Sequence, residues 1–411
     1  GAAETLQDLL PDAEKRIKQV MKVFPDPYAL TLYTDQLLIA GDAELERTQP
    51  LDPDDWEVTE VYWDAVTSRI APALEQIAAR PSESSRYPVD LRRFPNSLDL
   101  DYLADLRALA RELKIDALHW AVAGDSEKTA DAILAIPPLA ISLNDEPILI
   151  SQLVRIAILS MTTDSLEMAL NRTELDKDDL ERIEVALTTD LRPEVNERAM
   201  IRALVGETAG GLYLAGSFLL LLNAPRTSDV VNGQALSYEL AIPASGERMA
   251  MTTNFRYLMG HIDDSWTELS RSDLNISLPT RQGAGLVAPL TAVWDSSSSS
   301  TLVSVRRAQA QITVARTAVT VERFRLAEGR LPADLTELVP EYLPEVPMDY
   351  FADNKTPLRY RGGEDGAFVV YSVSQNGKDD GGLEIERWWD RGDITFTVAP
   401  VSFREGPQIE E

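Results

Sequence analysis

The amino-acid sequence predicts two regions of different fold class, a mainly α N-terminal region built as an irregular helical array and a small α+β C-terminal region. Three observations support this division. From Leu6 to about Leu290 the apolar residues recur mostly at spacings of three and four, as amphipathic helices require. Asp295 is followed by five serines, a run with little to bury. Beyond the serines, segments dense in β-branched and aromatic residues favour short antiparallel strands.

The helical pattern of the N-terminal region is clearest around Leu103, Leu106, Leu109 and Leu113, where alanines occupy several positions between the leucines. Further helices are expected over Asp12–Val23, Trp56–Ala79, Ile115–Ala135, Glu146–Leu170 and Lys177–Thr188. The connections contain turn residues, and the pair Pro137–Pro138 is expected to form one of these turns. Because no fixed-period repeat is convincing, an irregular array is favoured over a solenoid.

A helical hairpin is predicted around Thr173. Leu166 and Leu170 lie on the apolar side of its first helix. Asp176 fits the N-cap of the second helix, and Asp179 places an acid in the first turn, where it interacts favourably with the helix dipole.

The serine run is the expected boundary between two domains. Residues 1–295 are assigned to the helical domain, residues 296–300 to a serine-rich linker and residues 301–411 to the α+β domain. The length of 411 residues exceeds the usual size of one core and favours two domains. The alternative is a solvated loop inside a single domain.

In the C-terminal region one long helix is expected to precede a short antiparallel sheet. Leu302–Leu326 carries apolar residues at helical spacing, and Gly329 is placed to end the helix. Ala367–Val373 and Asp393–Val398 have the composition of strands, and Leu358–Arg361 is a weaker strand candidate.

The chain is strongly acidic, with 39 Lys and Arg against 67 Asp and Glu and a formal net charge of -28. A field of this sign repels phosphates and anionic head groups, so nucleic acid is not an expected partner. Without cysteine, disulfides and thiolate metal sites are excluded. The longest apolar stretch, Leu212–Leu222, is shorter than the roughly 18 residues of a transmembrane helix. Any membrane attachment is therefore expected from an N-terminal anchor preceding Gly1.

A series of short motifs gives the last part of the chain a resemblance to a known family. In order, the motifs are Glu322–Arg325, Gly329–Pro332, Leu335 and Leu338, Val346–Asp349, Pro357–Tyr360, Tyr371–Ser372, Asn376–Gly382 and Asp393–Ile394. Their order and spacing resemble the periplasmic domains of type II secretion major pseudopilins of the G type, and a similar module of uncharacterised secreted proteins from planctomycete-like bacteria. The resemblance implies an extracytoplasmic location, periplasmic or secreted, and a head domain that contacts other proteins. A filament role is not implied, because a long helical region precedes the motifs.

The same resemblance implies a calcium site in the loop between the last two strands, held by carboxylates and backbone carbonyls. Asn376 stands where the family has Asp before Gly, and Asp393 matches the family's Asp before Ile. Asp379 and Asp380 are further acids, and the backbone of Ser372–Ser374 would supply carbonyls. A hard cation takes about six to eight such oxygens. The amide at position 376 and an insertion before Asp393 depart from the pattern, and a metal-free hairpin loop is the alternative.

The insertion contains two adjacent tryptophans, Trp388 and Trp389. If they are exposed, they are expected to anchor a protein partner or sugar rings, because tryptophan offers a large contact area on few rotatable bonds. If they fold against Leu383 and Ile385, they complete a small core instead.

No catalytic constellation is evident in the sequence. His119 and His261 are the only histidines, which excludes a three-His zinc site, and no His-Glu-x-x-His or Gly-x-Ser-x-Gly motif occurs. His119 follows Asp116 by three positions, a spacing that suits an oriented imidazole. The alternatives are a helix-face ion pair or a partly buried ring. The sequence therefore predicts a structural or protein-interaction protein. The alternative is a secreted hydrolase that uses paired carboxylates in a cleft of the helical domain.

Overall fold

The computed structural model describes residues 100–189, 191–192, 195–207, 209, 288–352, 356–383 and 392–404, with positions 63, 67, 87 and 89–91 further upstream. For residues 288–302 and 403 it describes the backbone alone. The predicted helix Asp12–Val23, most of Trp56–Ala79, His261, Trp388 and Trp389 lie outside the described residues.

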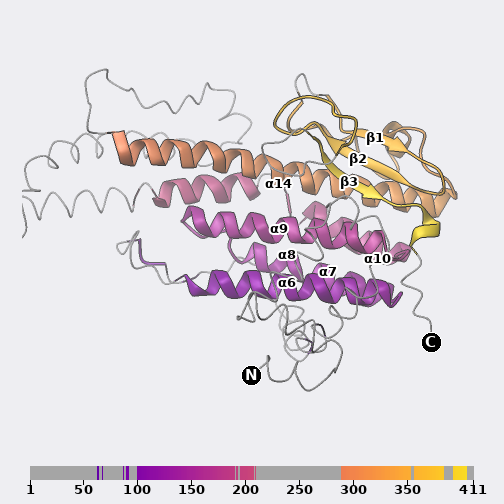
Figure 1. The fold of residues 1–411 in the computed structure, drawn as a ribbon, viewed down its shortest axis with the longest axis horizontal. Helices are drawn as coiled ribbons and strands as arrows, with labels where there is room; N and C mark the ends of the chain where they lie inside the picture. The colour runs from indigo at the N-terminus through magenta and orange to yellow at the C-terminus, as the bar shows by residue number, and fades with distance from the viewer. Residues whose placement is uncertain are drawn as a thin grey trace, which may run out of the picture.

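The region upstream of residue 210 is helical wherever it forms regular structure that is described (Figure 1). Its helices are α6 (Asp101–Val122), α7 (Ser126–Leu134), α8 (Ile136–Ile141), α9 (Leu149–Leu170), α10 (Lys177–Thr189) and a helix over residues 195–207. The predicted helices at Glu146–Leu170 and Lys177–Thr188 are confirmed as α9 and α10.

The predicted helical segment Ile115–Ala135 is divided between α6 and α7. Gly124 adopts a left-handed φ of 71° after the end of α6, a conformation that glycine reaches without a Cβ clash. Asp125 then caps α7 by accepting a hydrogen bond from the backbone N–H of Lys128 at 3.1 Å.

The turn predicted at Pro137–Pro138 is wrong, because both prolines lie in the first turn of α8. The first backbone N–H groups of a helix have no intrahelical acceptor, so proline removes no hydrogen bond there, and its fixed φ suits the helix. Neither proline therefore interrupts the helical array.

The hairpin predicted around Thr173 is present between α9 and α10. The backbone N–H of Leu180 donates to the carbonyl of Asp176 at 2.9 Å. Asp179 is buried, and its carboxylate accepts hydrogen bonds from Ser126 Oγ at 2.7 Å and Arg182 Nη1 at 2.9 Å. The acid expected in the first turn of α10 thus also ties the hairpin to the start of α7.

The long C-terminal helix α14 (Ala288–Glu328) begins well before the predicted start at Leu302. In place of the expected linker, the serines at 296–300 are helical. Serine is less favourable in a helix than alanine by no more than about 0.7 kcal/mol, a cost that packing readily outweighs. Just beyond the serines, Val305 is buried against Met200 and Leu204 of the helix over residues 195–207.

The C-terminal sheet has three antiparallel strands in the order β1-β2-β3, namely β1 (Arg359–Gly362), β2 (Phe368–Ser372) and β3 (Ile394–Val398). The predicted combination of a long helix and a short antiparallel sheet is confirmed. Figure 1 shows the sheet lying along the C-terminal half of α14, beside the ends of α9 and α10. Two single 3-10 turns, η2 (Leu335–Leu338) and η4 (Val401–Phe403), flank the sheet in sequence.

The outer edge of β3 is covered by side chains of Glu167 in α9 and of Asn171, the residue that follows α9. Glu167 Oε1 accepts a hydrogen bond from the backbone N–H of Thr397 at 2.7 Å. One turn later, Asn171 Nδ2 donates to the carbonyl of Thr397 at 2.8 Å, and Asn171 Oδ1 accepts from the N–H of Ala399 at 2.6 Å. Two polar side chains at the C-terminal end of α9 therefore satisfy backbone groups that a neighbouring strand would otherwise pair.

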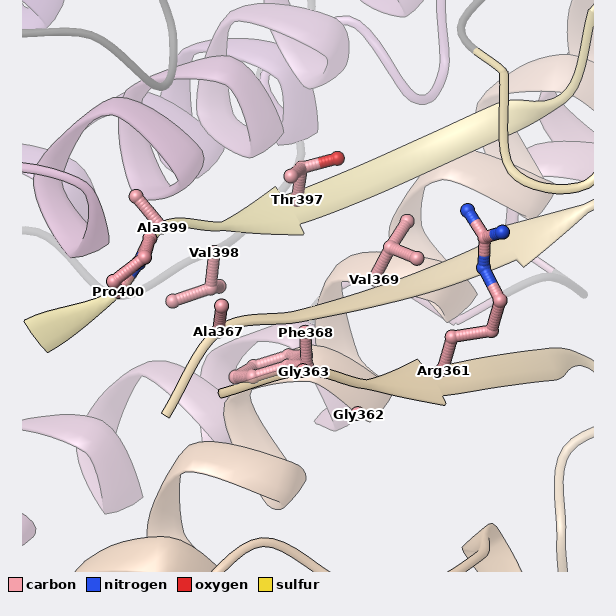
Figure 2. Close-up of a pocket in the computed structure, with 10 residues that line it drawn as sticks. All are labelled: Arg361, Gly362, Gly363, Ala367, Phe368, Val369, Thr397, Val398, Ala399 and Pro400. Atoms are coloured by element: carbon pink, nitrogen blue, oxygen red, sulfur yellow. The ribbon is translucent and has the colours of Figure 1, made fainter. Parts of the chain in front are cut away.

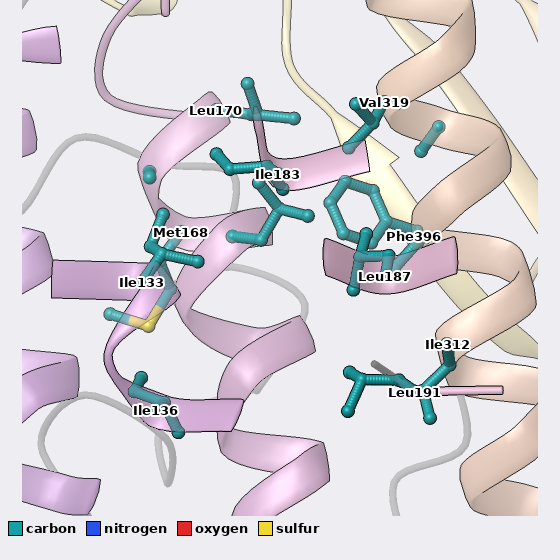
Figure 3. Close-up of a cluster of buried hydrophobic side chains, with 14 of the residues drawn as sticks. Ile133, Ile136, Met168, Leu170, Ile183, Leu187, Leu191, Ile312, Val319 and Phe396 are labelled. Atoms are coloured by element: carbon teal, nitrogen blue, oxygen red, sulfur yellow. The ribbon is translucent and has the colours of Figure 1, made fainter. Parts of the chain in front are cut away.

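One hydrophobic cluster extends from the helical region to the sheet (Figure 3). Ile133 and Leu170 of the helical region belong to it together with Val319 of α14 and Phe396 of β3. The cluster therefore contains residues from both sides of the serine run, and the sheet is held against the helical region by shared apolar packing.

Candidate functional site

The loop between β2 and β3 contains the residues that the sequence predicted for calcium. Ser372 ends β2 and is buried. Its hydroxyl donates to Asp349 Oδ1 at 2.6 Å, and the backbone N–H of Val373 donates to Asp349 Oδ2 at 2.9 Å. Asp349 also accepts from Arg359 Nη1 at 3.0 Å and is itself buried. Asp349 thus fixes the point where the chain leaves β2.

Asp393 is the central carboxylate of this loop and has no exposed surface. Its Oδ2 accepts a hydrogen bond from the backbone N–H of Gly382 at 2.7 Å, and its Oδ1 accepts from that of Asp380 at 3.4 Å. Burial raises the pKa of Asp393, and the charges of Asp379 and Asp380 raise it further, whereas the two backbone hydrogen bonds lower it. The loop therefore places negative charge around a buried carboxylate.

The remaining predicted ligands are held by contacts within or beside the loop. Asp379 accepts from Arg359 Nε at 2.8 Å and from the backbone N–H of Gly381 at 2.9 Å. Asn376 Nδ2 donates to Asp380 Oδ2 at 2.9 Å, and Asn376 Oδ1 accepts from the N–H of Lys378 at 2.8 Å. Each of these side chains has an oxygen of the kind that calcium prefers, and each oxygen named here is engaged in a hydrogen bond.

The loop turns through left-handed backbone conformations. Gly381 and Gly382 have φ values of 81° and 78°, and Ser374 adopts 61° without being glycine. The two glycines let the chain curl back so that the N–H of Gly382 reaches Asp393. Within the described ranges, no group of three or more acidic or imidazole side chains is gathered as a ready-made metal site. A cation in this loop would therefore recruit carboxylates from their present partners.

A second feature is a hollow of about 610 Å³ on the sheet (Figure 2). Its described lining comes from all three strands and the residues that follow them, namely Arg361, Gly362, Gly363, Ala367, Phe368, Val369, Thr397, Val398, Ala399 and Pro400. Among these lining residues there is neither a carboxylate nor an imidazole, and Arg361 is the charged member. The hollow was not predictable from the sequence, because its lining depends on which residues of the three strands are aligned.

His119 lies in an aromatic cluster at the end of α6. Its ring stacks on Trp63 with centroids 3.6 Å apart and meets the edge of Trp120 at 4.9 Å. Asp116 accepts hydrogen bonds from both indoles, at 2.7 Å from Trp63 Nε1 and 3.1 Å from Trp120 Nε1. Burial raises the pKa of Asp116, and the two indole hydrogen bonds oppose that shift. The Asp116 carboxylate thus joins two aromatic side chains of this cluster.

Two other acids of the helical region also have a raised pKa. Burial raises the pKa of Glu146, which accepts hydrogen bonds from Tyr102 at 2.8 Å and Ser151 at 3.3 Å. Burial likewise raises the pKa of Glu207, which accepts from the backbone N–H of Leu149 at the start of α9 at 3.0 Å. Both carboxyl groups connect structural elements.

The fold and these sites define a mainly helical protein with a small C-terminal antiparallel sheet and an acidic loop between its last two strands. No family model, curated protein or solved structure matches the chain. Among the described helices, none combines the length and the apolar composition needed to cross a bilayer.

Proposed function

We propose that this protein is an extracytoplasmic structural or protein-interaction protein whose C-terminal region is similar to a pseudopilin head and binds calcium through the β2–β3 loop. The proposal is supported by the motif order from Glu322 to Ile394 and by the packing of α14 against β2 and β3. The helical region serves as a scaffold that shares its core with the sheet.

The observation that carries the proposal is the environment of Asp393. A buried carboxylate is costly unless its charge is compensated. The Asp393 carboxylate accepts hydrogen bonds from two backbone N–H groups, and the nearby charges that shift its pKa are those of Asp379 and Asp380, which are negative. A divalent cation would reverse this balance by favouring the ionised form of all three acids.

Calcium suits this loop better than a softer metal because the donors are oxygens. Asp393, Asp379 and Asp380 provide carboxylates, Asn376 provides an amide oxygen, and Ser372–Ser374 provides backbone carbonyls. Asp379 would exchange its contact with Arg359 for the ion, and Asp380 would exchange its contact with Asn376 Nδ2. Because these exchanges cost free energy, the expected affinity is in the range of extracellular modules, about 10⁻⁴ to 10⁻³ M.

The environments of the raised-pKa acids support a structural function for the helical region. Asp116, Glu146 and Glu207 each accept hydrogen bonds from groups that hold helices or aromatic side chains in place. A carboxylate pair for hydrolysis needs an open position between its two members. The hydrogen bonds of these three acids join them to aromatic, hydroxyl and backbone groups in place of a second acid.

Thermal unfolding of the whole chain in millimolar calcium, in magnesium and in a chelator tests the calcium proposal. Calcium should raise the melting temperature above its value in chelator, because a ligand that binds only the folded state stabilises it. Asp393→Asn should abolish that rise. Asp105→Asn, which removes an exposed acid of α6, should retain it. Equal melting temperatures of the wild-type chain in calcium and in chelator would contradict the proposal.

Fractionation of the source cells with an antibody against the chain tests the extracytoplasmic location. The protein should be recovered from the periplasm, the envelope or the medium, and a cytoplasmic marker should remain in the cytosolic fraction. Recovery together with that marker would show that the location is wrong, whatever the calcium experiment gives.

A further inference from the structure

The hollow on the sheet follows from the register of the strands. Arg361 of β1 is aligned with Val369 of β2, and Val369 is aligned with Thr397 of β3. Because side chains alternate between the faces of a sheet, these three residues share one face. Figure 2 shows their side chains projecting to the same side of the three strands.

The next row on that face carries almost no side-chain volume. The backbone N–H of Gly363 donates to the carbonyl of Ala367 at 2.6 Å, and Ala399 follows Val398 at the end of β3. One glycine and two alanines therefore follow the row of Arg361, Val369 and Thr397. Because their side chains are small or absent, the surface of the sheet is lower there than at the preceding row. The hollow lies where the large side chains give way to the small ones.

The opposite face of the same strands is fixed by the core. Phe368 and Val398 are a cross-strand pair, and both are buried in the cluster that includes Val319 of α14. The floor of the hollow is therefore the rigid backbone of a packed sheet, and a ligand would meet a pre-formed surface.

Arg361 is the charged group of the hollow, and its guanidinium is available to a ligand. The residue is exposed, and among the described residues its side chain forms neither an ion pair nor a hydrogen bond, whereas its backbone pairs with Val369. The other arginine of β1, Arg359, is paired with Asp349 at 3.0 Å and with Asp379 at 2.8 Å. The chain has 67 acids against 39 Lys and Arg, so acidic partners are plentiful, yet the Arg361 side chain has none among the described residues. Arg361 can therefore bind an external anion.

We propose that this hollow binds the C-terminal carboxylate of a partner peptide with an apolar last residue. Arg361 would form a bidentate pair with the carboxylate, the geometry that guanidinium groups favour. Thr397 offers a hydroxyl in the same row, and Val369, Ala367 and Ala399 offer an apolar surface for the last side chain.

The size and shape of the hollow favour a peptide end over a free fatty acid. A volume of about 610 Å³ lies within the range of roughly 300 to 1,000 Å³ that is usual for ligand pockets. The hollow opens to solvent, so the rest of a longer chain can leave it. An enclosed apolar tunnel would suit an aliphatic tail better. The Arg361 guanidinium lies beside the calcium loop, because a Cβ added at Gly382 would be 3.2 Å from Arg361 Nη2. The peptide test is therefore made in chelator, so that its outcome is independent of calcium.

Isothermal titration calorimetry with acetylated tetrapeptides that end in leucine or phenylalanine tests the proposal on the whole chain. The free-acid peptides should bind, and the same peptides with an amidated C-terminus should bind at least about tenfold more weakly, because a charge-assisted hydrogen bond is lost. This comparison uses the unaltered protein and so does not depend on the folding of a variant.

Arg361→Gln should weaken the free-acid peptides by a similar factor and should leave the weak binding of the amidated peptides unchanged. Arg330→Gln is the matched control, because Arg330 pairs with Glu337 away from the hollow and loses the same charge. Equal binding of acid and amide, equal binding by wild type and Arg361→Gln, or no heat at millimolar peptide would overturn the proposal. Binding of decanoate without binding of the peptides would overturn the choice of a peptide as the ligand.

Discussion

Replacing Glu322 by glutamine should remove the anion at the centre of a buried charge network. Glu322 has no exposed side-chain surface and accepts hydrogen bonds from Arg325 at 2.8 and 2.9 Å and from Arg404 Nη1. Arg325 would keep its contact with Glu174 at 2.5 Å. Arg404 would remain buried, with the hydrogen bond from its Nε to the carbonyl of Ala399 at 3.3 Å. Breaking a buried pair on one side typically costs about 3 to 5 kcal/mol, which is the loss expected in the free energy of unfolding.

Urea unfolding followed by circular dichroism measures this loss. The matched control is Glu337→Gln, because Glu337 pairs with Arg330 at the surface, where solvent screens an ion pair and its loss should change stability little. A loss below about 1 kcal/mol for Glu322→Gln, equal to that of the control, would refute the reasoning from burial.

The same variant makes a prediction about pH. Burial alone would raise the pKa of Glu322, but the hydrogen bond from Arg325 and the charge of Arg404 hold it below its ordinary value of 4.5. A depressed carboxyl pKa stabilises the fold above the unfolded value, and this contribution is lost as the pH falls through the folded pKa. The difference in unfolding free energy between wild type and Glu322→Gln should therefore shrink in acid, and a constant difference would contradict this assignment.

Three further predictions concern individual contacts. Asn171→Ala should cost about 1 to 3 kcal/mol and speed the exchange of the Ala399 amide, because buried backbone groups of β3 lose their partners. Unchanged exchange would show that the helix does not protect this edge. Burial raises the pKa of Asp116, so the wild type should lose stability relative to Asp116→Asn as the pH rises from 3.8 toward neutrality, as urea midpoints would measure. Gly382→Ala should be more destabilising than Gly377→Ala in the same assay. Both have a positive φ, but a Cβ only at position 382 meets other atoms, at 3.2 Å.

Much of the fold was predictable because the local pattern and the tertiary packing agree. The apolar spacing of Lys177–Thr188 matches the helix that forms, and the β-branched segment Asp393–Val398 matches β3. The sequence pattern predicted the structure less well where tertiary packing determines the local conformation. The serines at 296–300 are helical although their own preference is weak, and Pro137 lies in the first turn of a short helix where a turn was expected.

The residues of the candidate sites also differ in how far the sequence predicts them. Asp393 and the loop acids were predicted because two short motifs of the sequence, Asn376–Gly382 and Asp393–Ile394, contain them. Asp349 lies in another quoted motif, but its role at the end of β2 depends on contacts with Ser372 and Val373 that sequence spacing does not encode. Arg361 was missed because the hollow exists only once three strands are aligned in register.

Hydrogen exchange of the β2–β3 loop with and without calcium tests the central claim most directly. Calcium bound by Asp393 and its neighbours should slow exchange of the Asp380 and Gly382 amides, because the ion orders the backbone that already donates to Asp393. Exchange in α6, measured on the same sample, should not change. Identical exchange of the loop amides in millimolar calcium and in chelator would contradict the account.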